Sequence, residues 1–169
     1  IVDFIALECR DGEPFHHIHG AGRDFAQVMA ALKEKGADPA GHPAVDVREY
    51  IYDMPVVMAA ADLVLCRAGA STISELTAIA KPSILVPSPN VVADHQTKNA
   101  RVLEQAGGAV LLPEGESSGE KLYQTAAGIL NDKDRREAMG AALRAMAVPD
   151  AAEQIYGVLS GLLGKKQGK

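Results

Sequence analysis

Short apolar runs alternate along this chain with longer segments in which apolar residues recur every three or four positions. Phe25, Val28, Met29 and Leu32 follow that spacing, which predicts a helix that ends at Gly36. The same reasoning predicts strands at residues 15–19, 44–49, 62–66, 83–87 and 109–112, and helices at 54–61, 71–80, 95–105, 118–130, 133–146 and 151–163.

The apolar runs at residues 62–66 and 83–87 are nearly continuous, which is typical of strands covered on both faces. Strands separated by helices indicate right-handed crossovers and a parallel sheet, so the pattern predicts an α/β fold. In such sheets a ligand binds beyond the carboxyl ends of the strands. The loops to inspect are therefore those at residues 19–22, 49–53, 67–72 and 88–96.

The loop at residues 67–72 belongs to the stretch CRAGASTISEL and carries small residues before a predicted helix. Gly69 has no Cβ, so the backbone can turn sharply there or approach a ligand closely. The N-terminus of the helix favours an anion such as a diphosphate. Thr72 and Glu75 also fit a capping box, with Thr72 as the N-cap. The spacing leaves helix capping and ligand binding both open, and a carboxylate at position 75 can accept bonds from two sugar hydroxyls.

The loop at residues 88–96 reads SPNVVADHQ and is long for a connection in an α/β fold. Asp94 is placed to cap the helix that follows. His95, Gln96 and Asn99 come next, and helical spacing puts residue 99 on a face with each of the other two. Such side chains can bind hydroxyl groups, although a solvated first helical turn explains the same residues.

The loop at residues 49–53 reads EYIYD, with Tyr50 and Tyr52 on either side of Ile51. The two tyrosines could form a flat, half-buried wall for a planar ring. Simple packing at a domain edge is the alternative interpretation.

The segment FHHIHGAG contains His16, His17 and His19, which raises the question of a metal site. On a strand only His17 and His19 point to the same side. The sequence pattern identifies no acidic or cysteine partner for these histidines, so a structural or polar-edge role is favoured over a metal site.

The composition fits one globular domain, since the chain has 169 residues, 47% hydrophobic and 23% charged. A net charge of −5 and an aromatic content of 4% argue against nucleic-acid binding. Cys9 and Cys66 are far apart and indicate reduced thiols, without zinc-binding spacing. No apolar run reaches the ~20 residues of a membrane span, and the acidic start does not resemble a signal peptide. Catalytic triads and dinucleotide-binding glycine motifs are also lacking.

Residues 49–112 together resemble the C-terminal, donor-binding half of the MurG family of glycosyltransferases. The resemblance rests on RAGASTISE, on PSILVP, and on DHQTKNA at the expected distances. It extends from about residue 15 to residue 163. HGAG resembles the family's H-Q-[ST]-G turn, with Gly20 where glutamine is usual. Members of this family transfer N-acetylglucosamine from UDP-N-acetylglucosamine to lipid I and so form lipid II.

The resemblance assigns a role in donor binding to several residues of this sequence. Ile51 would meet the uracil through its backbone, Gly69, Ala70, Ser71 and Thr72 would hold the diphosphate, Glu75 would bind the ribose hydroxyls, His95 and Gln96 would bind the sugar hydroxyls, and Asn99 is a neighbouring polar position. The resemblance implies no cofactor and no metal.

The departures from the family define what this chain would lack. Family members have the GT-B architecture, in which two Rossmann-like domains enclose the active site. The N-terminal domain, with the lipid I site and the general base, has no counterpart here, so no catalytic residue is expected in this chain. The strand that opens the C-terminal domain is also absent. The expected fold is therefore a Rossmann-like parallel sheet flanked by helices that lacks a central strand. We expect one partial UDP-sugar-binding domain at residues 1–163 and a disordered tail at 164–169.

The resemblance further implies a cytoplasmic enzyme that contacts the inner face of the membrane peripherally. Two alternatives remain open at this point. The chain could be the donor-binding subunit of a split N-acetylglucosaminyltransferase, which is not catalytic alone. It could also belong to another UDP-sugar enzyme of GT-B architecture.

Overall fold

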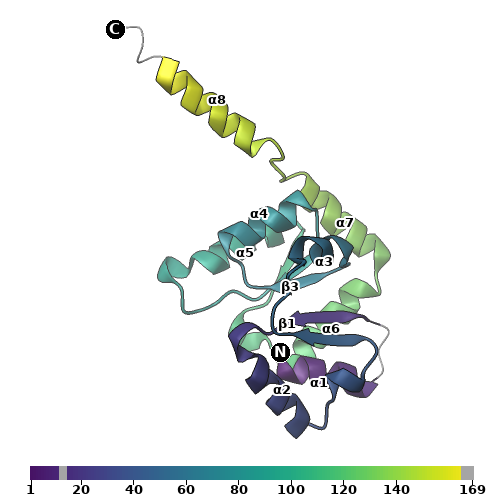
Figure 1. Cartoon of the computed structure of the whole chain (residues 1–169). Helices are drawn as coiled ribbons and strands as arrows, with labels where there is room; N and C mark the ends of the chain where they lie inside the picture. The colour runs from purple at the N-terminus through teal and green to yellow at the C-terminus, as the bar shows by residue number, and fades with distance from the viewer. Residues whose placement is uncertain (12–14, 165–169) are drawn as a thin grey trace.

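The computed structural model describes residues 1–11 and 15–164, in which short parallel strands are flanked by helices (Figure 1). The strands of this described part are β1 (His17–Gly20), β2 (Val45–Arg48), β3 (Val64–Cys66), β4 (Ser83–Leu85) and β5 (Ala109–Leu111). The α-helices are α1 (Val2–Asp11), α2 (Phe25–Glu34), α3 (Met54–Ala60), α4 (Ala70–Ala78), α5 (His95–Gln105), α6 (Gly119–Leu130), α7 (Lys133–Arg144) and α8 (Ala151–Gly164). Single 3₁₀ turns are η1 (Gly22–Asp24), η2 (Pro39–Gly41), η3 (Val92–Asp94) and η4 (Glu114–Glu116).

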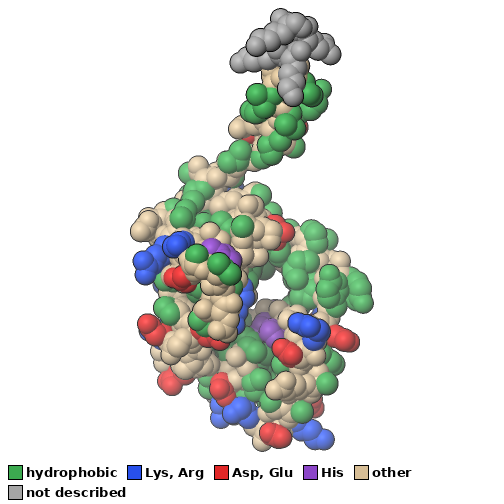
Figure 2. All heavy atoms as spheres, turned by 90° about the vertical axis from the view of Figure 1, so that its left-hand side faces the viewer, with side chains coloured by type: hydrophobic (Ala, Val, Ile, Leu, Met, Phe, Trp, Pro, Cys, Tyr) green, Lys and Arg blue, Asp and Glu red, His purple; other side chains and the backbone are tan. Residues whose placement is uncertain are grey.

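The strands form two separate parallel sheets rather than one. β1 pairs with β2, with His17 opposite Val45. β3, β4 and β5 pair in that order, with Ser83 between Val64 and Ala109. The predicted parallel α/β fold is confirmed, and the break between the two sheets agrees with the expected lack of a central strand. Figure 2 shows an opening in the molecular surface near the middle of the molecule.

Helix and strand positions follow the sequence pattern closely, with two informative shifts. α4 begins at Ala70 and ends at Ala78, where residues 71–80 were predicted. Ala80 has a left-handed backbone with a φ of 51°, so the chain leaves the helix earlier than the apolar pattern indicates. β4 is confined to Ser83–Leu85, since prolines at 82 and 87 flank it and proline has no N–H to donate.

Strand β4 carries the packing of the larger sheet on both of its faces. Ile84 lies in one apolar cluster with residues of α1, α2 and α6, including Ile5, Leu32 and Ile129. Leu85 lies in the other cluster, with residues of α4, α5 and α7. Because successive side chains of a strand point to opposite faces, the continuous apolar run produces two cores with one sheet between them.

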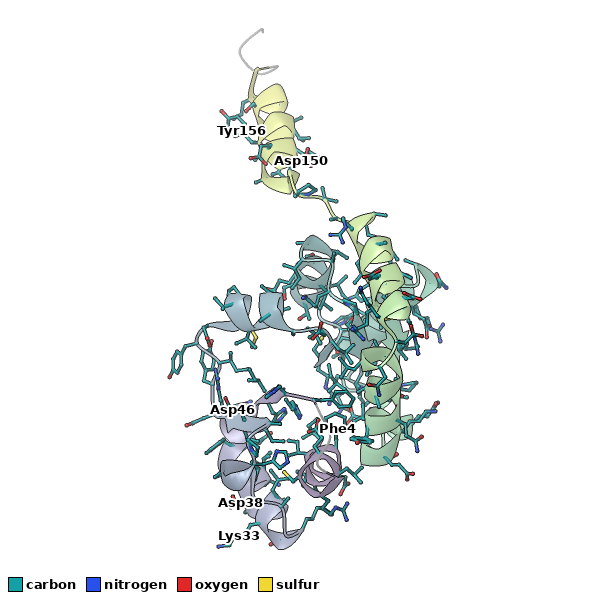
Figure 3. All side chains as sticks on the ribbon, turned by 90° about the vertical axis from the view of Figure 1, so that its right-hand side faces the viewer. Phe4, Lys33, Asp38, Asp46, Asp150 and Tyr156 are labelled. Carbon is teal, nitrogen blue, oxygen red and sulfur yellow. The ribbon has the colours of Figure 1, made fainter. Side chains whose placement is uncertain are left out.

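Helix α8, which carries Tyr156, projects away from the rest of the protein (Figure 1 and Figure 3). Every side chain from residue 151 to residue 163 is exposed, and the large apolar ones are Ile155, Tyr156, Val158, Leu159, Leu162 and Leu163. The described part of the chain has no helix with both the length and the apolar character needed to cross a bilayer. Of the predicted tail, Gly164 ends α8 and residues 165–169 lie outside the described residues.

Removal of α8 should leave the remaining fold stable, because the helix buries almost none of its side chains against it. We expect a chain ending at residue 150 to unfold within about 3 °C of the full chain in thermal denaturation followed by circular dichroism. Leu143→Ala is the matched control, since Leu143 is fully buried. It should cost about 2–5 kcal/mol. A large loss of stability on truncation, comparable to that of the control, would show that α8 packs on the body in solution.

Candidate functional site

The N-terminus of α4 is open to solvent and carries no side-chain cap. Gly69 occupies the N-cap position with an extended backbone, at φ −67° and ψ 153°. Ala70 and Ser71 are exposed, while Gly69 and Thr72 are half-buried. The N–H groups at the start of a helix have no partner within the helix, and they carry about half a positive charge. This arrangement leaves an electropositive helix tip accessible to an anion.

The predicted capping box at Thr72 and Glu75 is wrong. Thr72 is the third residue inside the helix rather than its N-cap, because the helix already begins at Ala70. Gly69 can take the N-cap position without a side-chain oxygen. Glu75 therefore lies in the second turn, where its exposed carboxylate does not serve the helix end.

The negative charge of the Glu75 carboxylate affects the thiol of Cys66 at the end of β3. Burial raises the pKa of the Cys66 thiol to about 11, and the negative charge of Glu75 adds to the shift. Both effects disfavour the thiolate, so Cys66 stays protonated near neutral pH. Cys66 and Cys9 are both free thiols, as their separation in sequence predicted.

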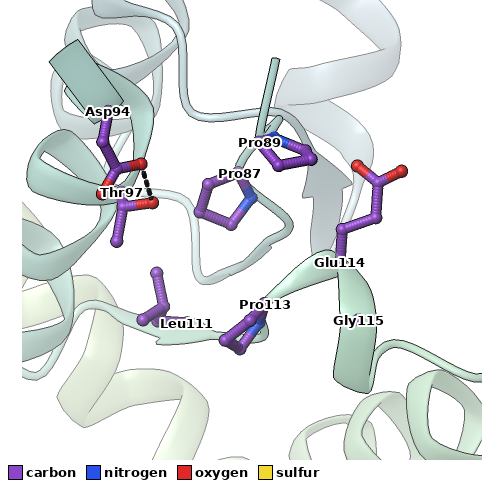
Figure 4. Close-up of a pocket in the computed structure, with 8 residues that line it drawn as sticks. All are labelled: Pro87, Pro89, Asp94, Thr97, Leu111, Pro113, Glu114 and Gly115. Atoms are coloured by element: carbon purple, nitrogen blue, oxygen red, sulfur yellow. Dashed lines mark hydrogen bonds between the residues drawn. The ribbon is translucent and has the colours of Figure 1, made fainter. Parts of the chain in front are cut away.

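The loop between β4 and α5 positions His95 and Asp94 in a tight turn. Ala93 and Asp94 both have left-handed backbones, with φ values of 54° and 51°. Asp94 occupies the predicted N-cap position, but its side chain makes no cap bond to the backbone. Its Oδ1 instead accepts a bond from the Thr97 hydroxyl at 2.6 Å (Figure 4). His95 is exposed, with Nδ1 2.9 Å from the carbonyl oxygen of Val92.

Two of the predicted ligand-binding amides also hold loops together. The backbone N–H of Ser88 donates to Oε1 of Gln96 at 2.9 Å. Nδ2 of Asn99 donates to the carbonyl oxygen of Ala68 at 3.1 Å. An amide side chain has further donor and acceptor capacity, so the NH₂ group of Gln96 and the oxygen of Asn99 can still bind a ligand.

Ile51 lies at the carboxyl end of β2 and is 7% exposed. A Cβ built at Gly20 would lie 3.3 Å from its Cδ1 atom, so Gly20 makes room for this packing. Tyr50 and Tyr52 are 64% and 90% exposed and meet edge to face, with ring centroids 4.9 Å apart. The predicted half-buried tyrosine wall is therefore wrong for this structure, and so is the alternative of tyrosines packed at a domain edge.

The structure brings the predicted residues together in two groups. Residues 69–75, His95, Gln96 and Asn99 lie on α4, on α5 and in the loop before α4, and the bond from Asn99 to Ala68 joins α5 to that loop. Ile51 lies in the loop after β2, beside Gly20 of the smaller sheet. Both groups occur after the carboxyl ends of parallel strands, which is where ligands bind in such folds.

A cavity of about 550 Å³ opens between the loops that follow β4 and β5 (Figure 4). Its lining residues are Pro87, Pro89, Asp94, Thr97, Leu111, Pro113, Glu114 and Gly115. The predicted donor-binding residues are not among them. Sequence reasoning missed Glu114 and its partner Arg67, whose Nη1 lies 2.5 Å from the Glu114 carboxylate.

The histidines on β1 contact one another and an acid from α1. His17 and His19 lie on one side of the strand, as predicted, with ring centroids 5.8 Å apart. Nδ1 of His17 is 2.5 Å from Oε2 of the buried Glu8, a partner that the sequence analysis did not find. Burial lowers the pKa of His19 to about 4, and the neighbouring His17 adds to that shift. Among the described residues, no three His, Cys, Asp or Glu side chains lie close enough to hold a metal ion.

Comparison with known protein families identifies residues 5–155 as a glycosyltransferase family 28 C-terminal domain. The chain is 43% identical to the UDP-N-acetylglucosamine--N-acetylmuramyl-(pentapeptide) pyrophosphoryl-undecaprenol N-acetylglucosamine transferase of Bacillus licheniformis, over 82% of this chain and 37% of that protein. It is 54% identical to the Salinibacter ruber protein of the same name, over 68% of this chain and 30% of that protein.

Solved structures agree with the sequence relatives. The crystal structure of Acinetobacter baumannii MurG matches with a TM-score of 0.72 and 28% identity, over 85% of this chain and 42% of that one. The glycosyltransferase VinC, solved with dTDP, shares the fold alone, with a TM-score of 0.66 and 13% identity over 93% of this chain and 37% of that one. The chain spans about two fifths of the length of several curated relatives. This chain belongs to the family of glycosyltransferase family 28 C-terminal domains.

Proposed function

We propose that this chain is the UDP-N-acetylglucosamine-binding half of an inverting N-acetylglucosaminyltransferase that forms lipid II in peptidoglycan synthesis. The observation that carries the proposal is the exposed, uncapped start of α4, which follows directly from β3 in a domain of this family. The curated relatives are named for transfer of N-acetylglucosamine to a pyrophosphoryl-undecaprenol acceptor, which supports the choice of donor and acceptor.

The diphosphate of the donor is assigned to the tip of α4. Gly69, Ala70, Ser71 and Thr72 provide N–H groups without partners inside the helix, and these groups favour an anion. As the bond to the sugar breaks, negative charge grows on the departing UDP, and fixed N–H dipoles stabilise it without reorganising. The proposal thus assigns leaving-group stabilisation to the protein backbone.

The nucleoside and the sugar are assigned to the groups on either side of that tip. The backbone at Ile51 receives the uracil, and the exposed carboxylate of Glu75 accepts bonds from the two ribose hydroxyls. His95, Gln96 and Asn99 surround the N-acetylglucosamine hydroxyls. His95 keeps Nε2 for this purpose, since Nδ1 faces the Val92 carbonyl.

The acceptor side of the reaction is assigned to the part of the parent enzyme that this chain does not contain. An inverting transfer needs a base that removes a proton from the attacking hydroxyl, and we assign this base and the lipid I site to an N-terminal half. Because the acceptor named for the relatives is linked to undecaprenol, the parent enzyme would work peripherally at the inner face of the cytoplasmic membrane.

Removal of the Glu75 carboxylate should weaken nucleotide binding. Glu75→Ala is expected to raise the dissociation constant for UDP about 10- to 100-fold in calorimetry, since bonds to a charged acceptor contribute about 1.5–3 kcal/mol. With 2′-deoxy-UDP the difference between the two proteins should shrink, because one of the two hydroxyls is gone. Glu137→Ala, at an exposed position of α7, is the matched control. Equal UDP affinity in Glu75→Ala and the unaltered chain contradicts the assignment of the ribose.

A Cβ at position 69 should obstruct the ligand while leaving the fold intact. Within the protein that Cβ would meet only Oγ1 of Thr72, at 3.7 Å, so the melting temperature should change by no more than about 4 °C. UDP affinity should nevertheless fall about tenfold or more, because the diphosphate would meet the new methyl group. Gly157→Ala, in the open on α8, is the control. Undiminished UDP binding by Gly69→Ala would place the phosphates elsewhere.

The purified chain should bind UDP but synthesise no lipid II, because the base and the acceptor site are assigned to another half. The measurement is transfer of labelled N-acetylglucosamine to lipid I in detergent, with Acinetobacter baumannii MurG as the positive control. Product formation by this chain alone would overturn the division of labour proposed here.

A further inference from the structure

The guanidinium of Arg67 connects the carboxyl ends of three adjacent strands. Arg67 follows β3 directly, and its Nη1 donates to the carbonyl oxygens of Val86 at 3.2 Å and Pro87 at 3.3 Å, just beyond β4. The same nitrogen lies 2.5 Å from Oε2 of Glu114, in η4 beyond β5. One side chain therefore fixes three strand exits relative to one another.

The loops fixed in this way are those that carry or contact the residues assigned to bind the donor. Arg67 is followed by Ala68, whose carbonyl oxygen accepts the Asn99 amide. Pro87 is followed by Ser88, whose N–H donates to Gln96. In Figure 4, Pro87 and Glu114 lie on neighbouring loops at the edge of the cavity. Arg67 is therefore linked by hydrogen bonds to η4 and to the loop after β4. The neighbouring residues Ala68 and Ser88 link both loops to α5.

This cluster contributes little to the stability of the whole fold. The side chains of Arg67 and Glu114 are 52% and 45% exposed, and exposed ion pairs add little to the free energy of unfolding. Its effect is instead geometric, since it joins the exits of three short strands and adds to the loop contacts made by Gln96 and Asn99. Small displacements of groups that bind a ligand cost affinity out of proportion to the stability involved.

We propose that Arg67 is a positioning residue for the donor site and that Glu114 anchors it. This inference rests on the proposed function, because the loops it fixes are those assigned to UDP and the sugar. Its guanidinium is directed toward the exits of β4 and β5 by all three of its contacts. It orders residues 68–72 and 86–96 without touching the ligand.

The competing role for Arg67 is direct contact with the diphosphate, and Glu114 separates the two. If Glu114 anchors a positioning residue, Glu114→Gln loosens both loops and lowers UDP affinity. If Arg67 binds phosphate directly, the same substitution frees the guanidinium, and UDP affinity stays the same or rises.

The test compares Arg67→Gln, Arg67→Lys and Glu114→Gln with the unaltered chain in calorimetry with UDP. We expect a loss of affinity of about tenfold for Arg67→Gln and about threefold for Glu114→Gln. Arg67→Lys should fall between the unaltered chain and Arg67→Gln, since a single ammonium replaces only part of the contacts. Glu137→Gln breaks the exposed pair of Lys133 and Glu137 on α7 and is the matched control, which should not change. Unchanged or tighter binding by Glu114→Gln overturns the proposal.

Hydrogen exchange of the ligand-free proteins tests the same inference without UDP. Backbone amides of residues 68–72 and 86–94 should exchange at least about threefold faster in Arg67→Gln, while those of α7 keep their rate. Unaltered exchange in both loops contradicts the proposal. Accelerated exchange in a chain that does not bind UDP would retain only the ordering of these loops by Arg67 and refute the proposed function.

Discussion

The parallel pairing of β3, β4 and β5 is the constraint on which the candidate site depends. β4 is buried on both faces, with Ile84 in one apolar cluster and Leu85 in the other. Parallel pairing aligns the strands in one direction, so their three carboxyl ends emerge at one edge. Residues far apart in sequence, such as Arg67 and Glu114, meet at that edge for this reason.

The chemistry available at this edge comes largely from the backbone. The tip of α4 lacks a side-chain cap, and its N–H groups remain available because Gly69, rather than a serine or threonine, holds the N-cap position. A capping side chain would stabilise the helix and occupy one of these N–H groups. In the proposed function the side chains around the tip add selectivity, through the carboxylate of Glu75 and the remaining hydrogen-bonding capacity of the Gln96 and Asn99 amides.

Several large apolar side chains are exposed on α8, which belongs to neither apolar cluster. The two sheets also meet at a break instead of along a shared strand. The chain also covers about two fifths of the length of several relatives, and the proposed function treats it as the donor side of a larger site. The assigned donor residues do not line the cavity that opens between the loops after β4 and β5.

The sequence by itself determined the alternation of strands and helices, since burial of β4 on both faces and the helical stripes leave periodic signals in the apolar residues. It located α5 at His95–Gln105 and the small residues before α4, and its motifs indicated the family. It misplaced the start of α4, because Thr72 and Glu75 satisfy a capping pattern whether or not the helix begins before them. The exposure of Tyr50 and Tyr52, the Glu8–His17 contact and the Arg67 cluster were decided by the tertiary structure alone. They depend on which distant segments the sheets bring together, and local spacing along the chain carries no record of that.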